Sequence, residues 1–167
     1  MRKVILITVS ILFAISIQSQ IKNSGCMIHH TTEGSKEMVL ENDTLKFEFK
    51  PTEYFWKVTI ENKIDKSATI HWNEVSFIRN KKASKVVFDD TSRINMNDPL
   101  PDQSIPSYSE VSKEIYPSEL WWESGPYPVY KKKSLRKEGD MLVRIILPIA
   151  IDGTKKNHEF SFLIKPS

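Results

Sequence analysis

The sequence predicts an all-β protein, most simply a β-sandwich of about eight short antiparallel strands. Apolar and polar residues alternate in several stretches, of which 54–72 is the clearest. A period of two places the apolar side chains on one face of a strand. Turn-forming residues separate these stretches at intervals of roughly 8–15 residues, which is typical of sandwiches and barrels. No helical period is evident after the first 25 residues.

Length and composition indicate one globular domain. The chain has 167 residues, of which 40% are hydrophobic and 27% are charged, enough for a core of its own. The net charge of +3 belongs to the leader, because residues 1–25 contain three basic and no acidic side chains and leave 21 of each kind in the rest. This balance gives no case for nucleic-acid binding through bulk charge.

Residues 1–25 have the pattern of a secretory signal peptide, which we expect to be helical. Arg2 and Lys3 precede an apolar run from Val4 to Ile17. The run matches the apolar region of a signal peptide and is shorter than the roughly 20 residues that span a membrane. The chain is therefore expected to leave the cytoplasm.

Cleavage of this leader has two alternatives. Ser24-Gly25-Cys26 resembles a lipobox, in which the Cys becomes lipidated and N-terminal, although Asn23 stands where an aliphatic residue is usual. Alternatively, signal peptidase cuts after the small residue Ser19. Because Cys26 is the only cysteine, it forms no disulfide within the chain. An unpaired thiol is a liability in an oxidising compartment, so we expect a lipid anchor at Cys26 and a flexible tether over residues 26–37.

The domain is expected over residues 38–167, and its centre is the stretch 54–72. Here Trp56, Val58, Ile60 and Asn62 share one face of a strand. A polar turn leads to a second apolar strand that ends at Trp72, so we predict a central hairpin with Trp72 in the core. The other expected strands cover residues 38–40, 44–49, 75–78, 84–88, 105–111, 111–117, 141–151 and 158–165. Asp152-Gly153 predicts a tight hairpin turn between the last two.

A series of short motifs lies along the domain, at Phe55 to Asn62, Trp72, Phe77, Ile105-Pro106 and Tyr116-Pro117. This series resembles a family of uncharacterised bacterial lipoproteins and the broader group of immunoglobulin-like envelope domains. The resemblance implies an immunoglobulin-like β-sandwich exposed outside the cytoplasm, and it supplies no catalytic residues.

Motifs for catalysis are missing from the sequence. It contains no nucleophile elbow, zinc-protease motif, phosphate loop or dinucleotide fingerprint. The Asn and Asp residues between 89 and 102 offer oxygen ligands to a cation, but turn chemistry explains them equally well. We therefore assign no catalytic residue, no cofactor and no metal site.

An aromatic and proline-rich stretch followed by a basic run is the predicted binding region. Adjacent strand residues point to opposite faces, so one of two neighbouring Trp side chains can be core and the other outward. An outward Trp flanked by Tyr suits a protein partner or a sugar ring, and the lysines would steer an acidic partner. Alternatively, the rings cover a sandwich edge and the lysines form a solvated loop. The candidates are Trp121, Trp122, Tyr127, Tyr130, Lys131, Lys132 and Lys133.

The sequence thus predicts a lipid-anchored lipoprotein of the bacterial cell envelope. Its expected role is non-enzymatic, as a binding or assembly module for an envelope protein or glycan, with the membrane contacted through the lipid. One alternative is an envelope hydrolase whose carboxylates the sequence does not place. Another is an inhibitor or immunity-type protein that inserts residues 118–137 into a partner's site. Cleavage after Ser19 would instead give a periplasmic or secreted protein.

Overall fold

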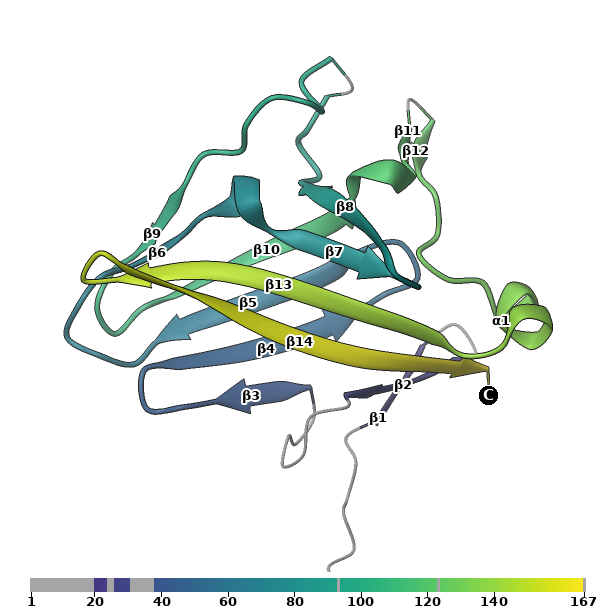
Figure 1. The fold of residues 1–167 in the computed structure, drawn as a ribbon, viewed down its shortest axis with the longest axis horizontal. Helices are drawn as coiled ribbons and strands as arrows, with labels where there is room; N and C mark the ends of the chain where they lie inside the picture. The colour runs from purple at the N-terminus through teal and green to yellow at the C-terminus, as the bar shows by residue number, and fades with distance from the viewer. Residues whose placement is uncertain (1–19, 24–25, 31–37, 93, 123, 167) are drawn as a thin grey trace, which may run out of the picture.

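The computed structural model describes residues 20–23, 26–30, 38–92, 94–122 and 124–166 (Figure 1). These residues form 14 β-strands, one α-helix and two 3-10 turns, and every strand pair is antiparallel. The fold is the all-β sandwich that the sequence predicts, with short strands that raise the number above eight. The expected signal-peptide helix lies outside the described residues.

The first layer of the sandwich is built around the longest hairpin. Its strands, in spatial order, are β1 (Gln20–Asn23), β2 (Cys26–His30), β14 (Thr154–Pro166), β13 (Met141–Ile151), β7 (Ser76–Arg79) and β8 (Lys82–Val87). In addition to β14 and β7, β13 pairs with β6 (Ala68–Ile70). β6 in turn pairs with β9 (Gln103–Ile105). β13 therefore organises this layer.

The second layer contains β10 (Glu110–Pro117), β5 (Trp56–Asn62), β4 (Leu45–Pro51) and β3 (Val39–Glu41). β8 links the layers, because its last residues, Val86 and Val87, pair with β10. Between the layers, Phe49 of β4 lies 4.7 Å from Phe160 and 5.0 Å from Phe162 of β14, measured between ring centroids. This aromatic contact marks the centre of the core.

Strand β5 confirms the predicted inner face and corrects the predicted hairpin. Trp56, Val58, Ile60 and Asn62 are all buried. However, β5 pairs with β4 and β10, whereas β6 pairs with β13 and β9. The connection crosses from one layer to the other. The side-chain Nδ2 of Asn62 donates hydrogen bonds to the carbonyls of Lys66, Ile105 and Pro106. The two strands therefore form no hairpin.

Two other hairpins agree with the sequence. β7 and β8 are joined at Asn80 and Lys81, whose φ angles are 45° and 72°. β13 and β14 are joined at Asp152 and Gly153, with φ of 49° and 72°. Positive φ at both central residues matches the right-handed twist of the strands, and Asn, Asp and Gly adopt it most readily.

The structure differs from the sequence predictions at the N-terminus and after Tyr130. Residues 26–30, expected as the start of a tether, form β2 and pair with β14, while residues 31–37 lie outside the described residues. Residues 132–138, expected as a loop, form the helix α1 (Lys132–Glu138). Within the part of the chain that the structure describes, no helix is long and apolar enough to cross a membrane.

Candidate functional site

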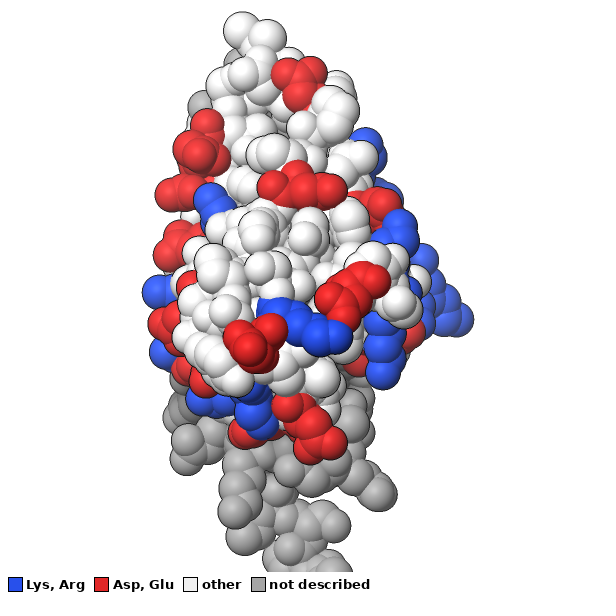
Figure 2. Space-filling model, turned by 90° about the vertical axis from the view of Figure 1, so that its left-hand side faces the viewer, with Lys and Arg blue, Asp and Glu red and all other residues white. Residues whose placement is uncertain are grey.

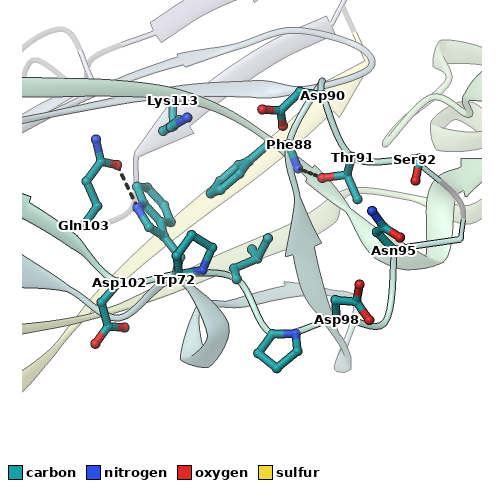
Figure 3. Close-up of a pocket in the computed structure, with 13 residues that line it drawn as sticks. Trp72, Phe88, Asp90, Thr91, Ser92, Asn95, Asp98, Asp102, Gln103 and Lys113 are labelled. Atoms are coloured by element: carbon teal, nitrogen blue, oxygen red, sulfur yellow. Dashed lines mark hydrogen bonds between the residues drawn. The ribbon is translucent and has the colours of Figure 1, made fainter.

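An open cleft of about 450 Å³ lies between residues 88–103 and the sandwich (Figure 3). We call residues 88–103 the acidic loop. Trp72 and Phe88 form the inner wall of the cleft, and Lys113 of β10 lies against Phe88. The acidic loop is part of the long connection from β8 to β9, and it projects at the top of Figure 1.

Buried aromatic rings hold the inner wall of the cleft. Trp72 is 2% exposed, and it opens the 3-10 turn η1 (Trp72–Glu74) directly after β6. Its ring meets that of Phe88 edge-on, with centroids 5.2 Å apart, and its Nε1 donates to Gln103 Oε1 at 2.9 Å. The Lys113 Nζ lies 4.8 Å above the centroid of Phe88. Trp72 is therefore buried, as the sequence predicts.

Consecutive turns shape the acidic loop. The Phe88 amide donates to Thr91 Oγ1 at 3.1 Å, and the Thr91 amide donates to the Phe88 carbonyl at 3.1 Å. The amides of Asn95 and Asp98 each donate to a carbonyl three residues earlier, at 3.1 and 3.0 Å. Ser, Asn and Asp favour such turns because their side chains bond the local backbone. The turn interpretation of this segment is thus supported.

Carboxylates dominate the charge of the cleft. Of the described residues that line it, Asp90, Asp98 and Asp102 are acidic and Lys113 is the single cation. Asp102 Oδ2 also lies 2.9 Å from Nδ1 of His71. Among the described residues, no group of three or more His, Cys, Asp or Glu side chains is arranged to hold a metal ion. The lining favours a ligand or partner with positive charge.

A projecting hairpin lies at the same side of the molecule (Figure 1). It contains the 3-10 turn η2 (Ser118–Leu120), β11 (Trp121–Trp122) and β12 (Gly125–Pro126), and we call residues 118–127 the aromatic hairpin. Trp121 turns inward, with its ring 4.8 Å from that of Tyr116. Trp122 and Tyr127 are each 50% exposed, with ring centroids 6.2 Å apart. One Trp is thus inward and the other outward, as predicted.

Hydrogen bonds connect the aromatic hairpin to the acidic loop and to the sandwich. Trp121 Nε1 donates to the Thr91 carbonyl at 3.0 Å. Glu119 of η2 accepts a hydrogen bond from Arg79 of β7 at 2.9 Å. The Tyr127 amide donates to the Leu120 carbonyl at 2.7 Å. The acidic loop and the aromatic hairpin therefore share a fixed base, and together we call them the loop surface.

Tyr130 does not belong to this surface, contrary to the sequence expectation. Its side chain is only 2% exposed, and its Oη has no hydrogen-bond partner among the described residues. Burial raises the pKa of Tyr130 well above its ordinary value. The Val129 amide before it donates to the Glu53 carbonyl at 2.7 Å, which turns this part of the chain back onto the sandwich. Tyr130 is a core residue.

Lys131, Lys132 and Lys133 lie away from the aromatic hairpin. They form the N-cap and the first turn of α1, which is held to the sandwich by the buried Leu135. Figure 1 shows α1 well separated from β11 and β12. The predicted aromatic and basic patch is therefore divided between two places, and the lysines do not flank Trp122.

Cys26 lies at the start of β2, opposite Pro166 of β14. Its side chain is fully buried. Burial raises the pKa of the Cys26 thiol, while the positive charges of Lys132 and Arg136 act in the opposite direction. The thiol therefore packs in the core beside α1.

Sequence reasoning missed Ile94 and the cleft itself. Ile94 is 92% exposed near the tip of the acidic loop. The Asn, Asp and Pro residues around Ile94 indicate a loop. No local pattern shows that Trp72 of η1 and Lys113 of β10 line a cleft with this loop.

Searches with the chain find no matching protein-family profile, no matching curated protein and no matching solved structure. The resemblance to bacterial envelope lipoproteins accordingly stays a prediction.

Proposed function

We propose that the protein is a non-enzymatic binding module of the bacterial cell envelope, and that it captures a protein partner through the loop surface. The observation that supports this proposal is the exposure of large apolar side chains on both projecting segments. Ile94 is 92% exposed, and Trp122 and Tyr127 are each 50% exposed. Exposed aromatic residues of this kind dominate the binding energy of protein interfaces.

The fixed base of the loop surface supports the same proposal. The aromatic hairpin is bonded to the acidic loop through Trp121 and to β7 through Glu119. A surface whose backbone is already held loses less conformational entropy on binding. The cleft beside it offers a concave region for one side chain of the partner, and its three carboxylates favour a basic one. We therefore propose a partner that places a basic side chain in the cleft.

An inhibitor or immunity-type protein is the second candidate function. The aromatic hairpin projects from the sandwich with Trp122 exposed, which is the geometry that insertion into a partner's site requires. In this case the captured partner is an enzyme, and its activity falls on binding.

Delivery to the envelope is part of the proposal and follows from the leader. Of the two cleavage alternatives, the position of Cys26 favours the cut after Ser19. Lipidation at Cys26 requires the buried Sγ to leave the core, whereas a cut after Ser19 leaves β1 and β2 intact, since β1 begins at Gln20.

The test is partner capture by three variants of equal net charge. Trp122→Ala and Tyr127→Ala are expected to reduce capture by a factor of about 30 or more, because interface hot spots contribute at least roughly 2 kcal/mol each. Tyr108→Ala is the matched control: Tyr108 is 70% exposed, on the turn between β9 and β10. Equal capture by all three variants would exclude the loop surface as the binding site.

A further inference from the structure

The helix α1 presents an uninterrupted row of cations. At about 100° per residue, Lys132, Arg136, Lys133 and Lys137 follow one another around the helix, over roughly 140° of its circumference. Leu135 points to the other side and is buried against the sandwich. Lys133, Arg136 and Lys137 are exposed. We call this row the basic face.

Three of the four cations of the basic face lack a compensating partner among the described residues. No ion pair or hydrogen bond reaches the side chains of Lys133, Arg136 or Lys137 there. Asp140, just after the helix, is 3.7 Å from Lys165 instead. At the opposite end of the molecule, which faces the viewer in Figure 2, basic and acidic side chains are interspersed, and Lys155 is paired with Glu74 at 2.7 Å.

This arrangement opposes helix formation. Lys132 with Arg136 and Lys133 with Lys137 are like-charge pairs at the i, i+4 spacing, which destabilises a helix. The first turn contains two lysines and no acidic residue, although the helix dipole favours negative charge at that end. Arg136 and Lys137 lie in the last turn, where the dipole favours cations, so the dipole conflict is confined to the first turn. An anionic partner would relieve both repulsions, and local conflicts of this kind in a folded protein are expected where there is a function.

We infer that the basic face binds the anionic headgroups of a phospholipid bilayer. It contains no exposed aromatic or apolar side chain, which a specific protein interface needs at its centre. It lies on a helix that protrudes from the sandwich in Figure 1. A protruding convex surface can contact a flat anionic surface, whereas binding of a single extended chain would call for a groove. Clusters of four or more Lys or Arg bind anionic membranes in this way.

The position of α1 supports a bilayer as the occupant. Lys132 and Arg136 lie close enough to Cys26 to act on the charge of its thiol, so the basic face is beside the strand to which the expected leader leads. The inference rests on the proposed function in one respect, the delivery of the chain to the outer side of a membrane. It does not depend on the loop surface, which is on a separate part of the molecule.

The experiment measures binding of the full chain to two kinds of vesicle, one of equimolar phosphatidylglycerol and phosphatidylcholine and one of phosphatidylcholine alone. Binding through the leader, including its basic residues Arg2 and Lys3, is the same in wild type and variants. A change between wild type and variant in the difference between the two vesicles therefore reports the basic face. Lys133→Glu with Lys137→Glu is expected to remove most of this difference and weaken binding to the anionic vesicle at least about tenfold. Added salt should weaken wild-type binding in the same way.

The matched control is Lys57→Glu with Lys85→Glu, which changes the net charge equally at exposed strand positions. It should bind the anionic vesicle as the wild type does. Equal loss in both double variants, or equal binding to both vesicles, would overturn the inference. Tighter binding to soluble polyglutamate than to anionic vesicles would also overturn it, and would show that the ligand of the basic face is an acidic chain and not a bilayer. Partner capture is measured without vesicles, so failure of either proposal is visible separately.

Discussion

Trp72 connects the core to the cleft at the scale of a single residue. It is one of the largest fully buried side chains, and its ring forms the inner wall of the cleft. Its Nε1 bonds Gln103, and its edge contacts Phe88. The packing of Trp72 therefore helps to position Gln103 and Phe88, which line the cleft with it.

Replacement of Trp72 by Ala should cost about 3–5 kcal/mol of unfolding free energy, because it leaves a cavity and an unpaired Gln103. A domain is stable by only about 5–15 kcal/mol, so the variant should be close to unfolding. Urea denaturation followed by circular dichroism measures the loss. Trp122→Ala, at a half-exposed site, should change stability by less than about 1 kcal/mol. Equal stability of the two variants would show that the burial assigned to Trp72 is wrong.

His158 predicts a pH dependence of stability. It lies on β14 against Phe47, with ring centroids 5.0 Å apart. Burial, and then the nearby charge of Lys156, lower the pKa of His158 below its ordinary 6.5. The unfolded chain therefore takes up a proton first as the pH falls below 6.5, which favours unfolding. This contribution to stability is complete above pH 6.5 and is lost as the pH falls through the folded pKa.

The measurement is the free energy of unfolding of wild type and His158→Gln between neutral pH and pH 5. Titration of the carboxyl groups is common to both, so the difference isolates His158. The wild type should lose stability more steeply than the variant in this window. Parallel curves would contradict the lowered pKa.

At the scale of elements, local patterns predicted strands well and their partners poorly. The inner face of β5, and the hairpins β7–β8 and β13–β14, follow from alternation and turn residues that act within a few positions. The pairing of β6 with β13 instead of β5 brings Ile70 opposite Ile149 and Ala68 opposite Ile151, and no local pattern encodes a pairing between residues so far apart in the sequence. The helix α1 was missed because seven residues with one buried Leu are too short for a helical period.

The turn between β7 and β8 offers a test at this scale. Lys81 has φ of 72°, a conformation that costs an L-residue about 1 kcal/mol or more and costs Gly almost nothing. Lys81→Gly should therefore raise the unfolding free energy by up to about 1 kcal/mol, measured by urea denaturation. Lys82→Gly, in the adjacent strand β8, should lower it by roughly 0.5–1 kcal/mol. A loss of stability from Lys81→Gly would contradict the assigned turn.

At the scale of the whole molecule, the structure divides the predicted patch into two surfaces. The strand alternation allowed one of Trp121 and Trp122 to turn inward, and in the structure Trp121 is half-buried beside Tyr116 while Trp122 is 50% exposed. The lysines were placed beside them in the sequence but not in space, because the chain returns through the buried Val129 and Tyr130 before α1 begins. Sequence proximity alone could not show this separation.

The N-terminus makes a prediction at the same scale. If Cys26 packs in the core, the mature chain begins at Gln20, and a labelled fatty acid is not incorporated. Mass spectrometry of the secreted protein measures both. Cys26→Ser should then be processed like the wild type. Fatty-acid labelling of the wild type that Cys26→Ser abolishes would restore the lipid anchor and require β2 to release its first residue.

The role of the loop surface is tested most directly by photo-crosslinking in the intact envelope. A photoreactive phenylalanine analogue in place of Trp122 should form a covalent adduct with one partner protein. The same analogue in place of Tyr108, which is more exposed than Trp122 and lies on the β9–β10 turn, should not form this adduct. Identical adducts from both positions, or none from position 122 while the protein remains folded, would contradict the assignment of the loop surface as the binding site.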